Sequence, residues 1–159
     1  MLQTSTSATP STPCVVFDVD GTLAEFDAGS LGGLVHGEVK NWDAFHQAMA
    51  GAEVIAPVGM LLRRLRDSGE VIVICSGRPA GWSSHTEAWL AQNDLTYDAI
   101  YLRPDGLDAI SDEEVKRQLL ATMRRDGFEL WIVVDDRSSV VETWRAEGLV
   151  CLQCAAGDF

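Results

Sequence analysis

Five short apolar runs, separated by stretches of helical periodicity, constrain the fold of this chain more than any other feature. The runs are four or five residues long and partly β-branched, which is typical of strands buried on both faces of a parallel sheet. They cover residues 14–17, 71–75, 99–102, 130–134 and 150–154.

Helical patterns fill the intervals between these runs. Apolar residues recur at spacings of three and four near 57–68, 83–92, 112–125 and 138–147. Ser111, followed three residues later by Glu114, has the signature of a capping box at a helix start. Alternating strands and helices imply βαβ units with right-handed crossovers. We therefore expect an α/β fold with a doubly wound, Rossmann-like, mostly parallel five-stranded sheet.

The segment after the first run is longer than one crossover requires. About fifty residues separate Asp20 from the run at 71–75. We expect a small helical cap inserted at about 25–55, in which Trp42, Phe45 and Met49 predict a short amphipathic helix. Nine of residues 1–13 are Ser, Thr or Pro, which predicts a disordered tail, so residues 14–159 would form one domain.

Charge and composition exclude several classes of protein. A net charge of −12 argues against a surface that coats nucleic acid, although ten of the twelve basic residues are arginines suited to a small phosphate pocket. No apolar run approaches the ~20 residues of a membrane span. With no export signal and no disulfide pattern, we expect a cytoplasmic protein with reduced cysteines. The Cys151–Cys154 pair is expected to pack, with a redox or metal role as the alternative.

Polar residues follow three of the apolar runs at the point where each ends. The sequences there are DVDGTLA at 18–24, SGR at 76–78 and DDR at 135–137. In an open α/β sheet, ligands bind beyond the carboxyl ends of the strands, which lie at one edge. One aspartate at a strand end is often only a turn former or cap. Three such segments predict a site with four carboxylates, a hydroxyl and two guanidinium groups.

This collection of groups suits phosphoryl chemistry with a hard metal ion. Clustered carboxylates repel one another, and oxygen ligands favour Mg²⁺ over zinc. A carboxylate beside the metal can attack phosphorus, and Asp20, on the same side as Asp18, can act as acid and base. Gly21 permits a tight turn there, and Ser76 can donate to a phosphoryl oxygen. Lys116 can neutralise charge on that group, unless it is an ordinary solvated helix lysine.

These residues carry a resemblance to a known superfamily. DVDGT at 18–22, Ser76, a helical Lys116 and the pair at 135–136 resemble the four signatures of the haloacid-dehalogenase superfamily. A closer likeness is to the 3′-phosphatase domain of bacteriophage polynucleotide kinase. It rests on SGR at 76–78, TEAWL at 86–90, DEEVK at 112–116, VVDDR at 133–137 and the stretch 140–159, which ends in GDF.

The resemblance implies an Mg²⁺-dependent phosphatase that removes a 3′-phosphate from nucleic-acid ends or nucleotides. It implies Asp18 as nucleophile, Asp20 as general acid and base, and Ser76 and Lys116 as phosphoryl-binding catalytic groups. The expected metal ligands are Asp18, Asp20, Asp135 and Asp136. The expected substrate-binding residues are Thr22, Gly77, Arg78, Arg103 and Asp112, with Asp112 orienting Lys116 or Arg78.

Two features depart from the family pattern. The family offers an arginine soon after its first signature, whereas Lys40 is the only basic residue between Glu25 and Leu62, with His36 as a candidate substitute. The chain has no G-x-x-x-x-G-K-[ST] motif, so we expect no kinase domain in cis.

Two further readings of the sequence remain open. Trp42, Phe45 and Trp82 could stack on a base or pack in the core. A phosphatase of small molecules, such as free nucleotides or sugar phosphates, is the alternative function, mildly favoured by the acidic surface.

Overall fold

The computed structural model describes residues 10–37 and 39–159. Its five strands form one sheet in the order β3-β2-β1-β4-β5, and every neighbouring pair is parallel. The strands are β1 (Thr12–Phe17), β2 (Val71–Pro79), β3 (Ala99–Arg103), β4 (Phe128–Asp135) and β5 (Cys151–Gln153). This arrangement confirms the predicted doubly wound α/β class. The strand order reverses at β1, so ligands are expected beyond the ends of β1 and its neighbours.

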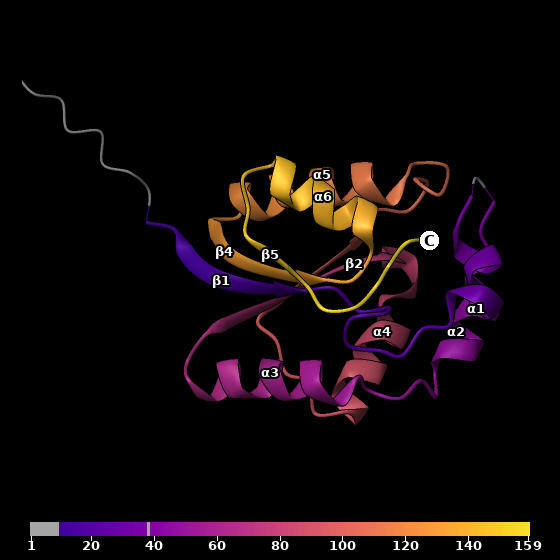
Figure 1. The fold of residues 1–159 in the computed structure, drawn as a ribbon, viewed down its shortest axis with the longest axis horizontal. Helices are drawn as coiled ribbons and strands as arrows, with labels where there is room; N and C mark the ends of the chain where they lie inside the picture. Colours follow the sequence, from indigo (N-terminus) through magenta and orange to yellow (C-terminus); the bar gives the residue numbers. More distant parts are fainter. Residues whose placement is uncertain (1–9, 38) are drawn as a thin grey trace, which may run out of the picture.

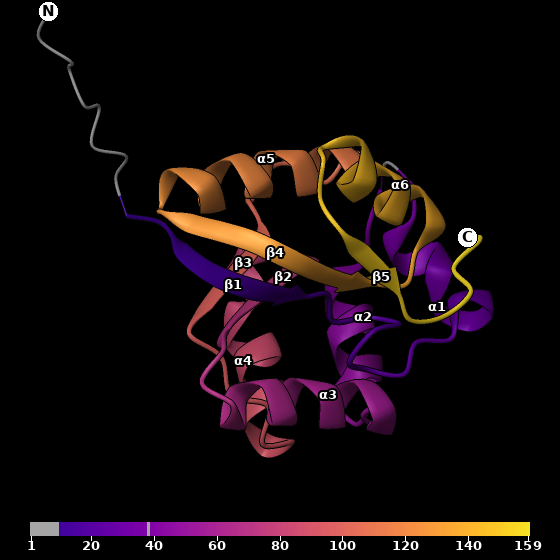
Figure 2. The ribbon, with the colours of Figure 1, turned by 60° about the vertical axis from the view of Figure 1, so that its left-hand side comes forward.

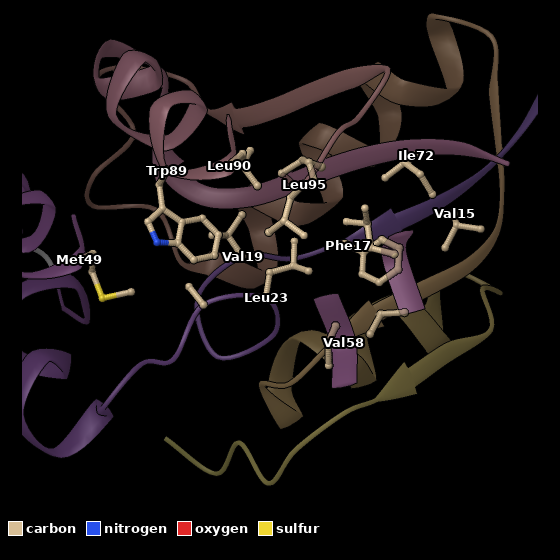
Figure 3. Packing of buried hydrophobic residues seen from close by; sticks show 14 of the residues in the cluster. Val15, Phe17, Val19, Leu23, Met49, Val58, Ile72, Trp89, Leu90 and Leu95 are labelled. Atoms are coloured by element: carbon tan, nitrogen blue, oxygen red, sulfur yellow. The ribbon is translucent and has the colours of Figure 1, made fainter. Parts of the chain in front are cut away.

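Helices cover both faces of the sheet (Figures 1 and 2). Helices α5 (Asp112–Arg125) and α6 (Ser138–Ala146) lie on one face, and α3 (Ala56–Asp67) and α4 (Ser83–Gln92) lie on the other. Side chains of β1 alternate between the two resulting cores: Val15 and Phe17 point to the α3/α4 side, Cys14 and Val16 to the α5/α6 side. Because both faces are buried, the strands read as continuous apolar runs. Figure 3 shows the first core, with Phe17, Ile72 and Leu95 packed together.

Two helices lie between β1 and α3, beyond the end of the sheet (Figure 1). Helix α2 (Trp42–Met49) coincides with the predicted amphipathic helix. Helix α1 (Ala28–Val35) was not predicted, because its sequence AGSLGGLV is rich in glycine, a poor helix former. Its start is stabilised by Asp27, whose side chain accepts a hydrogen bond of 3.0 Å from the backbone N–H of Gly29.

The first strand begins earlier than the sequence pattern indicated. Thr12 donates a backbone hydrogen bond of 2.8 Å to Gly127, and residues 12 and 13 pair with β4. The predicted tail is therefore wrong at its last two residues, because pairing with a neighbouring strand overrides a Ser/Thr/Pro composition. Its residues 1–9 lie outside the described part of the chain.

Three of the cysteines, Cys14, Cys75 and Cys151, are buried, whereas Cys154 is exposed, and all four are free. Within the described residues, no helix is long and apolar enough to cross a membrane.

Candidate active site

The turn after β1 places Asp18 at the carboxyl edge of the sheet. The backbone N–H of Asp18 donates to the carbonyl of Val134 at 3.0 Å, which fastens the strand end to β4. Gly21 has a φ of +81°, and a Cβ at this position would lie only 2.1 Å from Oδ2 of Asp136. Glycine is required at this one position for two reasons: its backbone conformation and the lack of space beside Asp136.

Lys116 reaches the same point from the first turns of α5. Its Nζ donates to Asp18 Oδ1 at 2.8 Å, to the carbonyl of Cys75 at 2.7 Å and to Asp135 Oδ2 at 3.3 Å. The residue is only 3% exposed, so it is not a solvated helix lysine. Burial alone would lower the pKa of this ammonium, but the charges of Asp135 and Asp18 outweigh that effect and raise it. Lys116 is therefore a fixed positive charge beside Asp18 and Asp135.

Three buried carboxylates meet at this edge. Oxygen atoms of Asp18, Asp135 and Asp136 lie within 4.8 Å of one another. Burial raises the pKa of Asp18 despite Lys116, and burial together with the charge of Asp135 raises the pKa of Asp136 to about 6. One ammonium does not balance three carboxylates. An all-oxygen set with excess negative charge fits a hard divalent cation such as Mg²⁺.

The groups around the acidic cluster hold it in place. Asp135 Oδ2 accepts a hydrogen bond from Trp144 Nε1 at 3.0 Å, and its Oδ1 accepts one from the backbone N–H of Asp136 at 2.9 Å. Thr22 is fully buried behind the cluster, and its hydroxyl lies 3.1 Å from Asp136 Oδ1 and 3.4 Å from Asp18 Oδ2. Thr22 therefore contacts the acidic cluster rather than the cavity in front of it.

Asp20 has a different partner from the other aspartates. Arg78, which is 2% exposed, donates to both oxygens of its carboxylate, from Nε at 2.9 Å and from Nη2 at 2.6 Å. The Asp20 side chain is therefore not among the carboxylates that could share a metal ion. Ser76 is also buried, and its Oγ accepts from the backbone N–H of Arg78 at 3.2 Å.

Asp112 lines the cavity, but its ion-pair partners differ from the predicted ones, and Arg103 lies away from the cavity. Asp112 pairs with Arg103 through one oxygen and with Arg137 through the other. The predicted pairing of Asp112 with Lys116 or Arg78 is therefore wrong. Arg103 is fully buried and does not line the cavity. It donates to the carbonyls of Gly77, Leu107 and Ile110 at 3.0, 2.7 and 2.7 Å. The structure thus places Arg103 beneath the site, where it supports loops.

A cavity of about 70 Å³ opens above these groups. Its polar floor includes Asp18, Ser76, Gly77 and Lys116. Its walls contain five aromatic rings, from Phe26, His36, Trp42, Phe45 and Phe159. Trp82 is not in the wall; it stacks on His46 instead, with ring centres 4.9 Å apart.

Sequence reasoning counted Arg137 among the guanidinium groups expected at the site but gave it no specific role, and it gave none to Phe159; both line the cavity. Arg137 Nε donates to the carbonyl of Phe159 at 2.8 Å, and the backbone N–H of Ser138 donates to Gly157 at 3.0 Å. A Cβ on Gly157 would lie 2.1 Å from the carbonyl of Asp136. The DDR motif at 135–137 and the GDF motif at 157–159 could be recognised in the sequence, but their contact with each other is evident only in the folded structure.

A parallel sheet with an aspartate cluster and a buried lysine at its carboxyl edge is the arrangement of a haloacid-dehalogenase-type phosphatase. Comparison with known proteins narrows the class. The family model of the polynucleotide kinase PNKP phosphatase domain matches residues 12–159. The chain belongs to this family.

Solved structures agree with that assignment. Chains in two structures, described as the Pnkp1/Rnl/Hen1 RNA repair complex and the Pnkp1/Rnl/Hen1 complex, are 26% and 27% identical to this chain, both with a TM-score of 0.77. The matches cover 100% and 99% of this chain but 48% and 51% of those chains, so it spans about half their length. A class C acid phosphatase from Bacillus anthracis, 20% identical over 83% of this chain and 54% of its own, shares the fold with a TM-score of 0.59.

Proposed function

We propose that this phosphatase removes a 3′-phosphate from nucleic-acid ends or nucleotides, with Mg²⁺ and an aspartyl-phosphate intermediate. One observation supports the chemistry above all: the ammonium of Lys116 bridges Asp18 and Asp135 at the floor of the cavity, at 2.8 and 3.3 Å. A nucleophilic carboxylate and a fixed cation beside it are what phosphoryl transfer to an aspartate requires.

In the first step, a carboxylate oxygen of Asp18 forms a bond to phosphorus, and the bond from phosphorus to the 3′-oxygen breaks. Protonated Asp20 donates its proton to the leaving oxygen, and to be protonated it must leave its ion pair with Arg78. Lys116 and the hydroxyl of Ser76 stabilise negative charge on the phosphoryl oxygens. In the second step, Asp20 takes a proton from water, which attacks phosphorus and releases Asp18 and inorganic phosphate.

The acidic cluster would hold the metal ion. Asp18, Asp135 and Asp136 supply the carboxylates, and when bound, Mg²⁺ would neutralise their charge and polarise the phosphoryl group. Asp20 was predicted as a fourth ligand, but its pairing with Arg78 favours a proton-transfer role for its carboxylate.

The preference for nucleic-acid ends rests on the family and on the cavity walls. Aromatic rings and Arg137 at the cavity suit a nucleoside next to the phosphate. One of the two Pnkp1/Rnl/Hen1 structures described above is an RNA repair complex, which supports an end-processing role. A cytoplasmic location is part of the same proposal.

A small-molecule phosphatase is the second candidate, because the net charge of −12 repels long polyanions at low salt. Specificity constants for a 3′-phosphorylated oligonucleotide, its 5′-phosphorylated isomer and p-nitrophenyl phosphate separate the two. We expect the 3′-phosphorylated oligonucleotide to be preferred and Mg²⁺ to be required. Equal constants for all three would refute the preference for nucleic-acid ends.

The covalent mechanism has a separate test. Asp18→Asn keeps the shape of the side chain but removes the nucleophile, and should lower kcat by at least about 10³-fold. An Asp18→Asn protein that turns over like the parent would exclude the aspartyl-phosphate.

A further inference from the structure

A second cavity, of about 110 Å³, lies between α2 and α4, which are neighbours in Figures 1 and 2. His46 and Met49 of α2 and His85 and Gln92 of α4 line it, and it shares only Arg78 with the active-site cavity. Its donor atoms are therefore imidazole nitrogens and a thioether rather than carboxylates.

His46 presents an unsatisfied nitrogen in this place. The residue is 2% exposed, and its Nδ1 lies 2.8 Å from the carbonyl oxygen of Trp42. A carbonyl only accepts, so Nδ1 carries the proton and Nε2 keeps a free lone pair. Among the described residues, the buried Nε2 has no hydrogen-bond partner. Leaving such an atom unpaired costs about 1–3 kcal/mol, so a ligand that bonds to Nε2 would be stabilising.

His85 lies across the cavity at a distance suitable for sharing a metal ion. The two imidazole centres are 5.3 Å apart and the rings are inclined by 57°. A metal ion about 2.0–2.1 Å from one nitrogen of each ring, with bond angles of about 90–120°, places ring centres roughly 4.5–5.5 Å apart. The ring of His46 is held in position by stacking on Trp82, nearly parallel at 5°.

We propose that His46 and His85 bind a divalent first-row transition-metal ion such as Zn²⁺ or Ni²⁺, separate from the Mg²⁺ expected at the aspartates. Imidazole and thioether donors suit these ions and not Mg²⁺, and Met49 and water would complete the coordination. The bond from Nδ1 to a backbone carbonyl is the usual support of a metal-bound histidine.

The electrostatic surroundings are compatible with this site. Burial lowers the pKa of His46, so the ring is neutral and able to bind metal near pH 7. The guanidinium of Arg78 opposes a second cation nearby, but its ion pair with Asp20 offsets that charge. The proposed metal site does not rest on the phosphatase reaction.

The test uses the untagged full chain, freed of metal and carrying Asp135→Asn to weaken the acidic cluster. Zn²⁺ titration by calorimetry, in excess Mg²⁺, should show one bound ion. His46→Gln and His85→Gln should each weaken Zn²⁺ binding at least about tenfold. His36→Gln is the matched control, since His36 is the only other histidine of the sequence, and this variant should bind Zn²⁺ like the parent.

Nitrogen NMR of the histidine rings gives a readout that does not depend on these variants. Zn²⁺ should shift Nε2 of His46 and a ring nitrogen of His85, and leave His36 unchanged. The proposal is overturned if both glutamine variants retain the affinity of the parent, if only His36 shifts, or if no Zn²⁺ binds. If His46→Gln does not fold, the Zn²⁺ affinity of His85→Gln, which alters an exposed residue, and the NMR shifts of the parent's histidine rings test the proposal.

Discussion

Arg78 grips the carboxylate of Asp20 with two parallel hydrogen bonds, from Nε to Oδ2 at 2.9 Å and from Nη2 to Oδ1 at 2.6 Å. The guanidinium is itself fixed, by a bond of 3.3 Å from Nη1 to the hydroxyl of Thr86 and by the ring of Phe45 at 5.3 Å. Strand β2, helix α4 and helix α2 thus act together on the orientation of one carboxylate.

We therefore predict that Arg78→Lys lowers kcat at least about tenfold, because lysine is a point charge that cannot hold both oxygens. The measurement is steady-state hydrolysis of p-nitrophenyl phosphate, with thermal unfolding to verify the fold. Phe45→Leu, which keeps an apolar side chain but removes the ring under the guanidinium, should have a smaller effect. Unchanged kcat in Arg78→Lys would contradict this role.

A second prediction concerns the charge balance around Asp18. Lys116→Met should lower the free energy of unfolding by about 3 kcal/mol, because it leaves the buried carboxylates of Asp18 and Asp135 without their cation. Adding Asp18→Asn should recover part of this loss, since one uncompensated charge disappears. Urea unfolding of both variants in EDTA provides the comparison. If the double variant is less stable than Lys116→Met, the electrostatic explanation fails.

A third prediction follows from the carboxyl of Asp136. Its pKa is raised from 3.8 to about 6 in the folded chain, so between these values the folded state holds more proton than the unfolded state. In metal-free protein, the free energy of unfolding should fall as the pH rises through this window. Asp136→Asn should flatten the profile and stabilise the protein at pH 7.5 by up to about 3 kcal/mol.

The control for this pH experiment is Glu142→Gln, which alters an exposed carboxylate on α6. It should leave the slope of stability against pH unchanged. A parent-like slope in Asp136→Asn would show that another group titrates in this range.

A fourth prediction separates two arginines near the cavity. Arg103→Gln should cost about 3 kcal/mol of stability because it breaks a buried ion pair with Asp112 and strands three carbonyls. Arg137→Gln, which alters a side chain 20% exposed in the cavity wall, should instead raise KM for the oligonucleotide. Unfolding and kinetics are measured for both. If Arg103→Gln instead raised KM and left stability unchanged, Arg103 would contact substrate, as the sequence suggested.

The sequence alone determined the sheet and the content of its active edge. Strands buried on both faces must be apolar throughout, so their ends could be located, and the ends of parallel strands must meet. For that reason Asp18, Ser76 and Asp135 were correctly expected at one edge. The limits of the cap, at about 25–55, stay a prediction, and α1 escaped detection because its stability depends on packing rather than on helix propensity.

Only the tertiary structure decided which charge pairs with which. Both Arg78 and Arg103 lie near the carboxyl ends of strands, yet Arg78 pairs with Asp20, whereas Arg103 is buried beneath the site and pairs with Asp112. Likewise, Lys116 comes from α5, 98 residues from Asp18, and Arg137 meets Phe159 across 22 residues. Periodicity in a sequence reports which face of an element is buried. Which charged groups form ion pairs depends on distances of a few ångströms, and these distances are set only when the helices and strands pack together.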